Sequence, residues 1–340
     1  MSTKKNILLL YNGYPRLSQS YQFDEAIELQ KQYNIMIMSW KWPIYETEKE
    51  LPDYLYIEQN SPLEHLDAIK KFNPDVIHGH YLDNAELLCQ MAKLLNIGFT
   101  LRTHSFDMLS DTITKYAKYI NDSKCYGIFV FVPFKQKCLD AGFDESKIFT
   151  CWPSININIF RNVFSAPNGS DIMSGGAFLP KKNIEGFILL AKKIKEIFPS
   201  KKISYYSVEE SPSYCKSIHL FNKKNGNPVE FKTVQHSDMP QEYKKHQWLI
   251  YSGCPKLKTV GCPLMVAEAQ ASGVGVIMYK LRDDLQDYVT DNGYLYTTND
   301  EVIDIIGSTF DSDKKTAAYE LSIRYDITKN IEQLSKMFRF

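Results

Sequence analysis

The chain has 340 residues, and 40 lysines and arginines balance 40 aspartates and glutamates, so its formal net charge at pH 7 is +0. This length suits two domains of ordinary size, and the balanced charge gives no overall field for nucleic acid or an anionic membrane, although local patches stay open. The seven cysteines include no CxxC pair and cannot all pair within the chain, which favours a reducing compartment, the cytosol.

The first 40 residues predict a β-α-β unit. Asn6–Tyr11 is apolar on both faces, like a buried parallel strand, and a helix near residues 23–30 leads to a second strand over Ile35–Trp40. Gly13 lies in the turn after the first strand, where open parallel sheets gather ligands, but no GxGxxG pattern supports a dinucleotide. The apolar run at 7–11 is too short for a signal peptide or a membrane span, and no later run reaches spanning length.

Two histidines end the next predicted strand. After a helix near 63–72, the segment NPDVIHGHY at 73–81 predicts a buried strand over Val76–His78. A zinc site at His78 and His80 would need a third ligand, and we expect a strand to place these two side chains on opposite faces. Strand-end packing or contact with a substrate is therefore favoured over a metal.

A third histidine follows another strand end. A helix over Asn84–Leu95 and a strand over Phe99–Arg102 lead to THSFD, residues 103–107, which contains His104 and Asp107. Because two such strand ends converge on one crevice, a functional role for His104 weighs evenly against a structural one. Further on we expect a solvated helix rich in lysine and tyrosine over 112–126, a strand over 128–132, a helix over 134–141 and an interdomain linker over 149–164.

The second half repeats this plan. A strand over Asp171–Ser174 runs into GGAFLPKKN at 175–183, where Gly176 lets the backbone approach a ligand and Lys182 brings positive charge to the start of a helix over 184–198. Strands at 203–208, 229–231 and 248–251 follow, and the last leads into a basic loop at 252–260. One or two helices are expected over 313–340.

The segment 261–277, GCPLMVAEAQASGVGVI, predicts a helix between Pro263 and Gly273 and then a short strand. Glu268 sits in this helix among small alanines, so a partner approaching closely would find a carboxylate able to accept two hydroxyl hydrogen bonds. The helix start favours an anion such as diphosphate. The plainer alternative is a buried alanine-rich helix with a solvated glutamate.

Taken in order, these segments resemble the retaining glycosyltransferases of family 4 over nearly the whole chain. The resemblance rests on YNGYPRLSQSYQFDE, PDVIHGHY, THSFD, GGAFLPKKN, MPQEYKKHQWLIYSG and GCPLMVAEAQASG. It implies an α/β protein of the GT-B fold, with two facing Rossmann-like domains and parallel sheets. Residues 1–155 with a C-terminal helix from about 318 to 340 would form the acceptor domain, and residues 156–317 the nucleotide-sugar-binding domain.

The resemblance also assigns roles to residues. Glu268 matches a glutamate that binds the ribose hydroxyls, Lys182 a lysine that neutralises the diphosphate, Gly13 a glycine near the phosphates and His104 the histidine beside the transferred sugar, here the catalytic candidate. Gly176 joins the donor-binding set, whereas the acceptor-side candidates are Arg16, His80 and Asp107. Such enzymes need no metal or other cofactor, and no convincing metal site is expected here.

Two positions depart from the family pattern. Val260 stands where the first of two paired glutamates would be, and Ala177 replaces an arginine before Lys182. Either the donor is held differently or activity is reduced. Lys256 or Lys258, in the basic loop, is a candidate to replace the lost positive charge, although two ordinary surface lysines remain the simpler account.

We therefore expect a metal-independent hexosyltransferase that moves a sugar, with retention, from a nucleotide-diphosphate sugar to a glycan or lipid-linked acceptor in surface polysaccharide synthesis. A UDP-sugar is favoured over a GDP-sugar as donor. The expected location is the cytoplasm, and peripheral contact with the inner face of the membrane stays open. The first alternative is a non-catalytic GT-B scaffold or partner subunit of another glycosyltransferase, and the second, less favoured, is a sugar-nucleotide epimerase or hydrolase.

Overall fold

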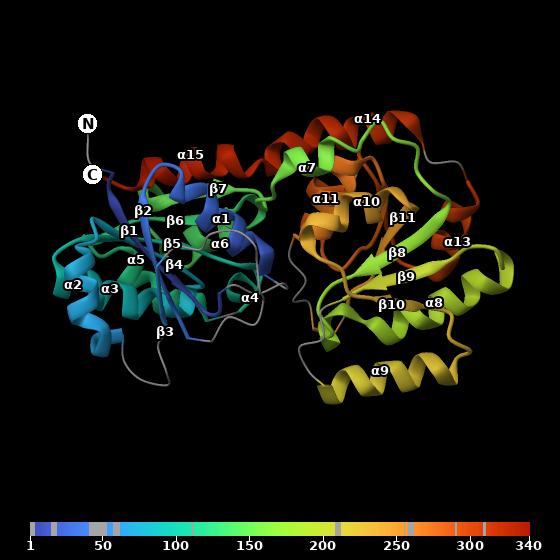
Figure 1. Cartoon of the computed structure of the whole chain (residues 1–340), viewed down its shortest axis with the longest axis horizontal. Helices are drawn as coiled ribbons and strands as arrows, with labels where there is room; N and C mark the ends of the chain where they lie inside the picture. The colour runs from blue at the N-terminus through green and yellow to red at the C-terminus, as the bar shows by residue number, and fades with distance from the viewer. Residues whose placement is uncertain are drawn as a thin grey trace. The chain divides into compact units, whose positions relative to one another are not determined.

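The computed structural model describes residues 4–14, 19–40, 53–56, 62–110, 112–207, 212–254, 256–257, 262–289, 291–308 and 311–340. The chain divides into two compact units, which we call the N-terminal unit (Met1–Ser154 with Ile327–Phe340) and the C-terminal unit (Ile155–Asp326) (Figure 1). Each unit is built around its own parallel sheet.

The N-terminal unit has a seven-stranded sheet in the order β3-β2-β1-β4-β5-β6-β7. Its strands are β1 (Asn6–Tyr11), β2 (Asn34–Ser39), β3 (Asp53–Tyr56), β4 (Val76–His80), β5 (Gly98–Arg102), β6 (Cys125–Phe131) and β7 (Ile148–Cys151). The central strand β1 is apolar and buried on both faces, as the sequence predicts for a strand covered by helices on either side. Strand order reverses between β1 and β4, and ligands of such sheets bind beyond the carboxyl ends at this reversal.

The helices of this unit are α1 (Ser20–Gln30), α2 (Leu66–Phe72), α3 (Ala85–Leu95), α4 (Ser105–Met108), α5 (Ala117–Ile120), α6 (Lys135–Asp140) and α15 (Ile327–Met337). Short 3-10 turns cover Pro62–His65, Leu82–Asn84, Ile113–Tyr116, Val132–Phe134 and Glu145–Lys147. Parallel strands joined through helices form right-handed crossovers, so reversing the direction of travel moves the helix to the other face of the sheet. Accordingly, α1 and α15 pack together on one face, and α3 and α5 on the other (Figure 1).

The C-terminal unit has a six-stranded parallel sheet in the order β10-β9-β8-β11-β12-β13. Its strands are β8 (Asp171–Gly175), β9 (Ile203–Tyr206), β10 (Glu230–Lys232), β11 (His246–Tyr251), β12 (Gly275–Tyr279) and β13 (Tyr294–Tyr296). The order reverses between β8 and β11, where Trp248 is fully buried in the core. The carboxyl ends of these two strands therefore mark the ligand-binding edge of this sheet.

The helices of the C-terminal unit are α7 (Ile157–Arg161), α8 (Ile184–Ile197), α9 (Pro212–Lys224), α10 (Met239–Lys244), α11 (Leu264–Ser272), α12 (Gln286–Val289), α13 (Asn299–Gly307) and α14 (Ser312–Leu321). Short 3-10 turns cover Pro180–Lys182, His236–Asp238, Asp283–Leu285 and Ser322–Tyr325. Figure 1 shows α8 and α9 on one face of the sheet and α10 and α11 on the other, as the same crossover rule requires.

One sequence-based expectation is wrong, and a second holds only in part: the chain does cross between the units within 149–164, after Ser154. The helix expected over 112–126 ends at Ile120, because Asp122 forms a turn in which its carboxylate accepts the backbone N–H of Lys124, and β6 starts at Cys125. The segment 149–164, expected to be a linker, contains part of β7 and all of α7. β7 lies at the edge of its sheet and is half-buried, so its sequence lacks the continuous apolar run that marks a central strand.

The tail forms two separate helices. The one that belongs to the N-terminal unit, α15, starts at Ile327, whereas α14 belongs to the C-terminal unit. α15 buries Ile331, Leu334 and Met337 in the same core as β1 and packs against α1. Among the residues that the structure describes, no helix combines the length and apolar character that crossing a bilayer requires.

Candidate functional site

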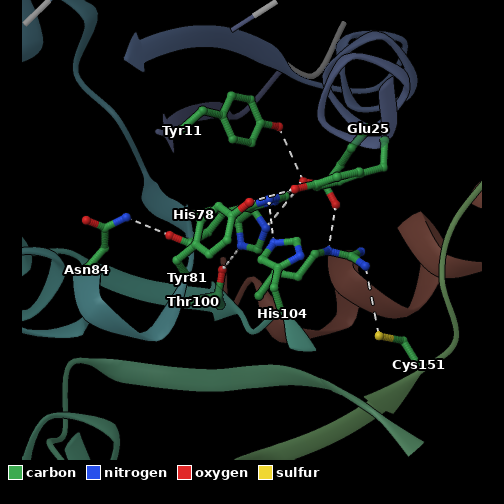
Figure 2. Close-up of polar contacts among 11 residues, drawn as sticks. Tyr11, Glu25, His78, Tyr81, Asn84, Thr100, His104 and Cys151 are labelled. Atoms are coloured by element: carbon green, nitrogen blue, oxygen red, sulfur yellow. Dashed lines mark hydrogen bonds and ion pairs between the residues drawn. The ribbon is translucent and has the colours of Figure 1, made fainter. Parts of the chain in front are cut away.

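Side chains from β4, β5 and α1 form a buried polar cluster at the carboxyl edge of the N-terminal sheet. Its members are Glu25, His78, His80 and Arg102, each no more than 3% exposed, and it extends to the partly exposed His104 (Figure 2). We call it the Glu25 cluster. It brings together two candidates from the sequence, His80 and His104, with two residues that were not singled out, Glu25 and Arg102.

The expectation that His78 and His80 point to opposite faces of their strand is wrong. Residues two apart on a strand share a face, because successive side chains alternate. The Nε2 atoms of His78 and His80 lie 3.5 and 2.7 Å from the same oxygen of Glu25, Oε1. Glu25 could have been noticed from its place four residues before the buried Leu29, on the core-facing side of α1.

A guanidinium group balances the carboxylate of Glu25. Arg102 Nε lies 2.9 Å from Glu25 Oε2. Burial by itself would raise the pKa of Glu25, but the neighbouring Arg102 and His80 hold it well below its ordinary value. Burial lowers the pKa of His80 to about 4 against the opposing effect of Glu25, so at neutral pH Glu25 is charged and His80 is neutral.

Glu25, His78 and His80 also bring three atoms of metal-ligating type within 4.8 Å of one another. A divalent cation there would lie beside the guanidinium of Arg102, which already neutralises the only carboxylate of the three. The second oxygen of that carboxylate is engaged by Arg102, and His80 already makes a 2.7 Å hydrogen bond to the first. On charge and on distance, the group fits a hydrogen-bonded network better than a metal centre.

His104 is held by contacts to its ring and to its backbone. Its Nε2 lies 3.2 Å from His80 Nδ1, and its backbone N–H donates to Asp107 Oδ2, which also accepts the N–H of Leu82. Burial lowers the pKa of His104 well below its ordinary value and raises that of Asp107 to about 7. Asp107, an acceptor-side candidate, thus anchors the loop in which His104 lies.

Tyr81 covers the ring of His104. The two ring centroids are 4.3 Å apart, and the hydroxyl of Tyr81 lies 2.9 Å from that of Tyr21. Tyr81 has a φ of 70°, a conformation that a bulky side chain rarely adopts and that costs on the order of 1–3 kcal/mol. Its backbone N–H donates to the carbonyl of Arg102, which helps to hold it there. Such strain is found where function requires an unusual conformation.

The other sequence candidates in this unit are Gly13 and Arg16. Gly13 is buried in the turn after β1, next to Asn12, whose side chain accepts a hydrogen bond from Asn84. Arg16 lies outside the residues that the structure describes. The carboxyl ends of β1 and β4 therefore place Gly13 and the Glu25 cluster at one edge of the sheet.

In the C-terminal unit, Gly176 and Lys182 lie against each other at the carboxyl end of β8. Gly176 has a φ of +127°, and a Cβ placed on it would lie 3.0 Å from Cε of Lys182. The ammonium of Lys182 donates to the hydroxyl of Tyr251, at the end of β11. Burial lowers the pKa of Lys182 to about 8. Among the described residues, no carboxylate forms an ion pair with this ammonium, which leaves its charge available to an anion.

The helix α11 runs from Leu264 to Ser272, as the sequence predicts, with Gly273 in the left-handed conformation at its end. Glu268 is 4% exposed, and its carboxylate accepts a hydrogen bond from Tyr243 at 2.7 Å and contacts His236 Nε2 at 3.3 Å. The glutamate is therefore neither solvated nor in contact with alanines alone. Tyr243 and His236 are residues that sequence reasoning missed, because they lie 25 and 32 positions away.

The start of α11 approaches the lysine site. A Cβ on Gly175, the last residue of β8, would lie 2.6 Å from the sulfur of Met265. The N-cap residue is Pro263, which has no side-chain oxygen to satisfy the first N–H groups of the helix. Lys182 and this helix start thus belong to the same edge of the C-terminal sheet, a combination suited to an anion.

The basic loop before α11 is described only in part. Lys256 is exposed, whereas Lys258 and Val260 lie outside the described residues. Ala177 is half-buried, one residue after Gly176. Compensation of the missing arginine by Lys256 or Lys258 therefore stays a prediction.

Comparisons with known proteins place this fold. No protein-family model and no curated protein matches the sequence. Solved structures do match: Anabaena HepE in complex with UDP-glucose has a TM-score of 0.76 and 16% identity, over 97% of this chain and 99% of that chain. Sucrose-phosphate synthase from Thermosynechococcus elongatus has a TM-score of 0.75 and 16% identity, over 98% of each chain. TarM has a TM-score of 0.73 and 13% identity, over 100% of this chain and 99% of that chain.

These similarities extend over the whole chain and establish the fold as α/β of the GT-B type, with two Rossmann-like parallel sheets. The fold class expected from the sequence is confirmed. The structural neighbours are GT-B glycosyltransferases.

Proposed function

We propose that this chain is a glycosyltransferase that moves a sugar, with retention, from a UDP-sugar to a glycan or lipid-linked acceptor, without a metal. The C-terminal unit would bind the donor and the N-terminal unit the acceptor. The observation that carries the proposal is the ammonium of Lys182, which forms no ion pair with a described carboxylate and lies with Gly176 and the start of α11 at the reversal point of a Rossmann-like sheet. The full-length similarity to HepE, solved with UDP-glucose, supports the choice of donor.

The chemistry explains why these groups suit a nucleotide sugar. When the bond from sugar to diphosphate breaks, negative charge grows on the leaving diphosphate, and groups already placed there stabilise the transition state. Lys182 supplies a positive charge and the first N–H groups of α11 supply hydrogen-bond donors. Gly176 lets the backbone approach the phosphates closely because it has no side chain. A metal is not needed for this neutralisation.

Glu268 is proposed to bind the ribose of the nucleotide. An ionised carboxylate offers about four lone-pair positions, and Tyr243 and His236 occupy two of them. The ribose hydroxyls would take the remaining positions from the side where His236, 19% exposed, meets solvent. Tyr243 would hold the carboxylate in place from the buried side.

His104 is proposed to contact the reacting sugar and Gly13 to lie near the phosphates of the donor, with His80, Asp107 and Arg16 on the acceptor side. His104→Ala should then lower turnover more than it weakens binding of UDP, because a contact made in the transition state appears mainly in kcat. Equal losses in both quantities would contradict this placement. Anomeric analysis of the product by NMR would test retention.

The experiment that tests the function measures UDP or GDP release from a panel of nucleotide sugars, together with thermal shifts by the free nucleotides. A bound nucleotide at 100 times its Kd should stabilise the fold by about 2.7 kcal/mol. Turnover should persist in EDTA. Absence of both binding and turnover with every donor would overturn the proposal, and binding of a partner transferase without turnover would instead favour a scaffold.

A further inference from the structure

The hydrogen bonds of the Glu25 cluster have a direction, and it can be followed from the carboxylate to His104. An ionised carboxylate only accepts hydrogen bonds, so in the 2.7 Å contact to Glu25 Oε1 the Nε2 of His80 carries the proton. In a neutral imidazole the other nitrogen is then an acceptor. His80 Nδ1 therefore accepts, and His104 Nε2 donates, in the 3.2 Å contact between the two rings.

We propose that Glu25 and His80 are positioning residues that hold His104 in one tautomer and one orientation, with the proton on Nε2 and the lone pair on Nδ1, where it faces the backbone N–H of Asp107 at the start of α4. The effect on turnover described below rests on the proposed function, but the tautomer does not.

The protonation states on both sides of this chain support its direction. Arg102, 2.9 Å from Glu25 Oε2, keeps the carboxylate charged. Burial lowers the pKa values of His80 and His104, so both rings stay neutral at physiological pH. Neither histidine then has a second ring proton, and the order of donors and acceptors is unique.

Packing restricts rotation of the His104 ring. Tyr81 lies 4.3 Å from it and Tyr21 5.1 Å, measured between ring centroids, and the hydroxyls of these tyrosines are 2.9 Å apart. Asp107 fixes the backbone of His104 through a 3.0 Å hydrogen bond. A turn of the ring would break the bond to His80 and leave a buried nitrogen without its partner, which is unfavourable.

Histidine ring ¹⁵N NMR on the full-length protein tests the tautomer directly. The ring signals of His104 and His80 are assigned by their loss in His104→Gln and His80→Leu. In wild type we expect Nε2 protonated and Nδ1 unprotonated on both rings, with ring N–H protons that exchange slowly enough with water to be observed. A proton on Nδ1 of either ring, or a doubly protonated His104 at neutral pH, would overturn the proposal.

A matched pair of variants separates positioning from general support of the fold. His78 and His80 are both fully buried on β4 and both approach Glu25 Oε1, but His78 donates to or accepts from Thr100 rather than His104. In His80→Leu the Nε2 proton of His104 loses its acceptor, so its signal should broaden or vanish. In His78→Leu the signal should remain. Equal changes in both variants would assign the cluster a purely structural role.

Activity and metal content complete the test. If the proposed function holds, His80→Leu should lower kcat at least tenfold while the Kd for UDP stays within about twofold of wild type. The expected tautomer without any turnover would leave the inference standing and remove the proposed function.

Zinc retained at one equivalent by wild type and lost in both His80→Leu and His78→Leu would overturn the inference, because His80 Nε2 would then be a ligand atom rather than a donor.

Discussion

At the scale of single residues, the structure separates groups that are available to a ligand from groups that the protein already uses. Lys182 keeps an ammonium whose described contact is a neutral hydroxyl, that of Tyr251. Lys244, by contrast, is buried and donates to the carbonyl of Ser272 at the end of α11 and to Asn168. Both lysines have a pKa lowered to about 8 by burial, yet only Lys182 lies at the carboxyl edge of the sheet. A perturbed pKa therefore identifies a candidate site only together with its position.

Lys182→Met should weaken UDP binding by roughly 10- to 150-fold, equivalent to about 1.5–3 kcal/mol for a hydrogen bond to a charged group. Wild-type affinity should also fall as pH rises through about 8, because the ammonium that attracts the diphosphate loses its proton. Calorimetric titration with UDP from pH 6.5 to 9.5 checks both effects. Lys193→Met, on the exposed side of α8, is the control and should bind like wild type. An unchanged pH profile in Lys182→Met would show that another group is responsible.

Glu268→Gln should weaken UDP binding at least tenfold, because the amide keeps one acceptor oxygen but loses the negative charge that two ribose hydroxyls would share. Tyr243→Phe is the matched variant. It removes the buried partner of the same carboxylate, so it should lower the free energy of unfolding by about 1–3 kcal/mol while UDP affinity changes less. Fluorescence-monitored unfolding and calorimetry give the two quantities. A larger loss of affinity in Tyr243→Phe than in Glu268→Gln would refute the ribose assignment.

At the scale of elements, the loops that leave the strands and the ends of the helices decide which side chains meet. The helix α11 stops at Gly273 because that residue takes a φ of +73°, and the strand β12 follows two residues later. In the N-terminal unit, the short helix α4 begins directly after His104, so the same loop that ends β5 also orients that ring. The loop after β5 thus brings His104 to the carboxyl edge of its sheet, whereas Gly273 returns the chain to the opposite edge, where β12 starts.

Two glycines at helix ends provide a matched test of packing. Gly273→Ala places a Cβ about 2.7 Å from Lys315 Cε and 2.8 Å from the ring of Phe164, whereas a Cβ at Gly142, which has a φ of +81°, meets no described atom within 4 Å. Gly142→Ala should cost about 1–2 kcal/mol for the left-handed backbone, and Gly273→Ala clearly more. Urea unfolding of each variant checks the order. Equal losses would mean that Lys315 and Phe164 move aside freely.

At the scale of the whole molecule, the chain crosses between its units twice and returns its last helix to the N-terminal unit. Leu334→Ala on α15 removes a fully buried side chain from the N-terminal core and should cost about 2–5 kcal/mol. UDP binding should stay within twofold of wild type, because Lys182 and Glu268 belong to the other unit. Thermal unfolding and calorimetry at 15 °C test this. Ile323→Ala, 40% exposed, is the control for a substitution near the tail, and a loss of UDP affinity in Leu334→Ala alone would contradict the division of roles.

The sequence by itself determined where the central strands and the helix α11 lie along the chain, and its resemblance to known glycosyltransferases predicted the GT-B fold. Buried parallel strands are continuous apolar runs, and helix ends have local signals such as Pro263 and Gly273. The edge strand β7 and the turn at Asp122 were not predicted, because exposure to solvent interrupts the apolar pattern that marks a buried strand. The sequence also indicated His80, His104, Lys182 and Glu268 as candidate site residues, since ligands bind near strand ends and helix starts.

Only the tertiary structure decided which groups surround those residues. Glu25 reaches His80 across 55 positions, and Tyr243 reaches Glu268 across 25. Such contacts have no local signature, because they depend on strand order and on the face that each helix turns toward the sheet. The error about His78 has another origin, because strand alternation alone places residues 78 and 80 on the same face. Only the position of Glu25, on another element, shows what that face contacts.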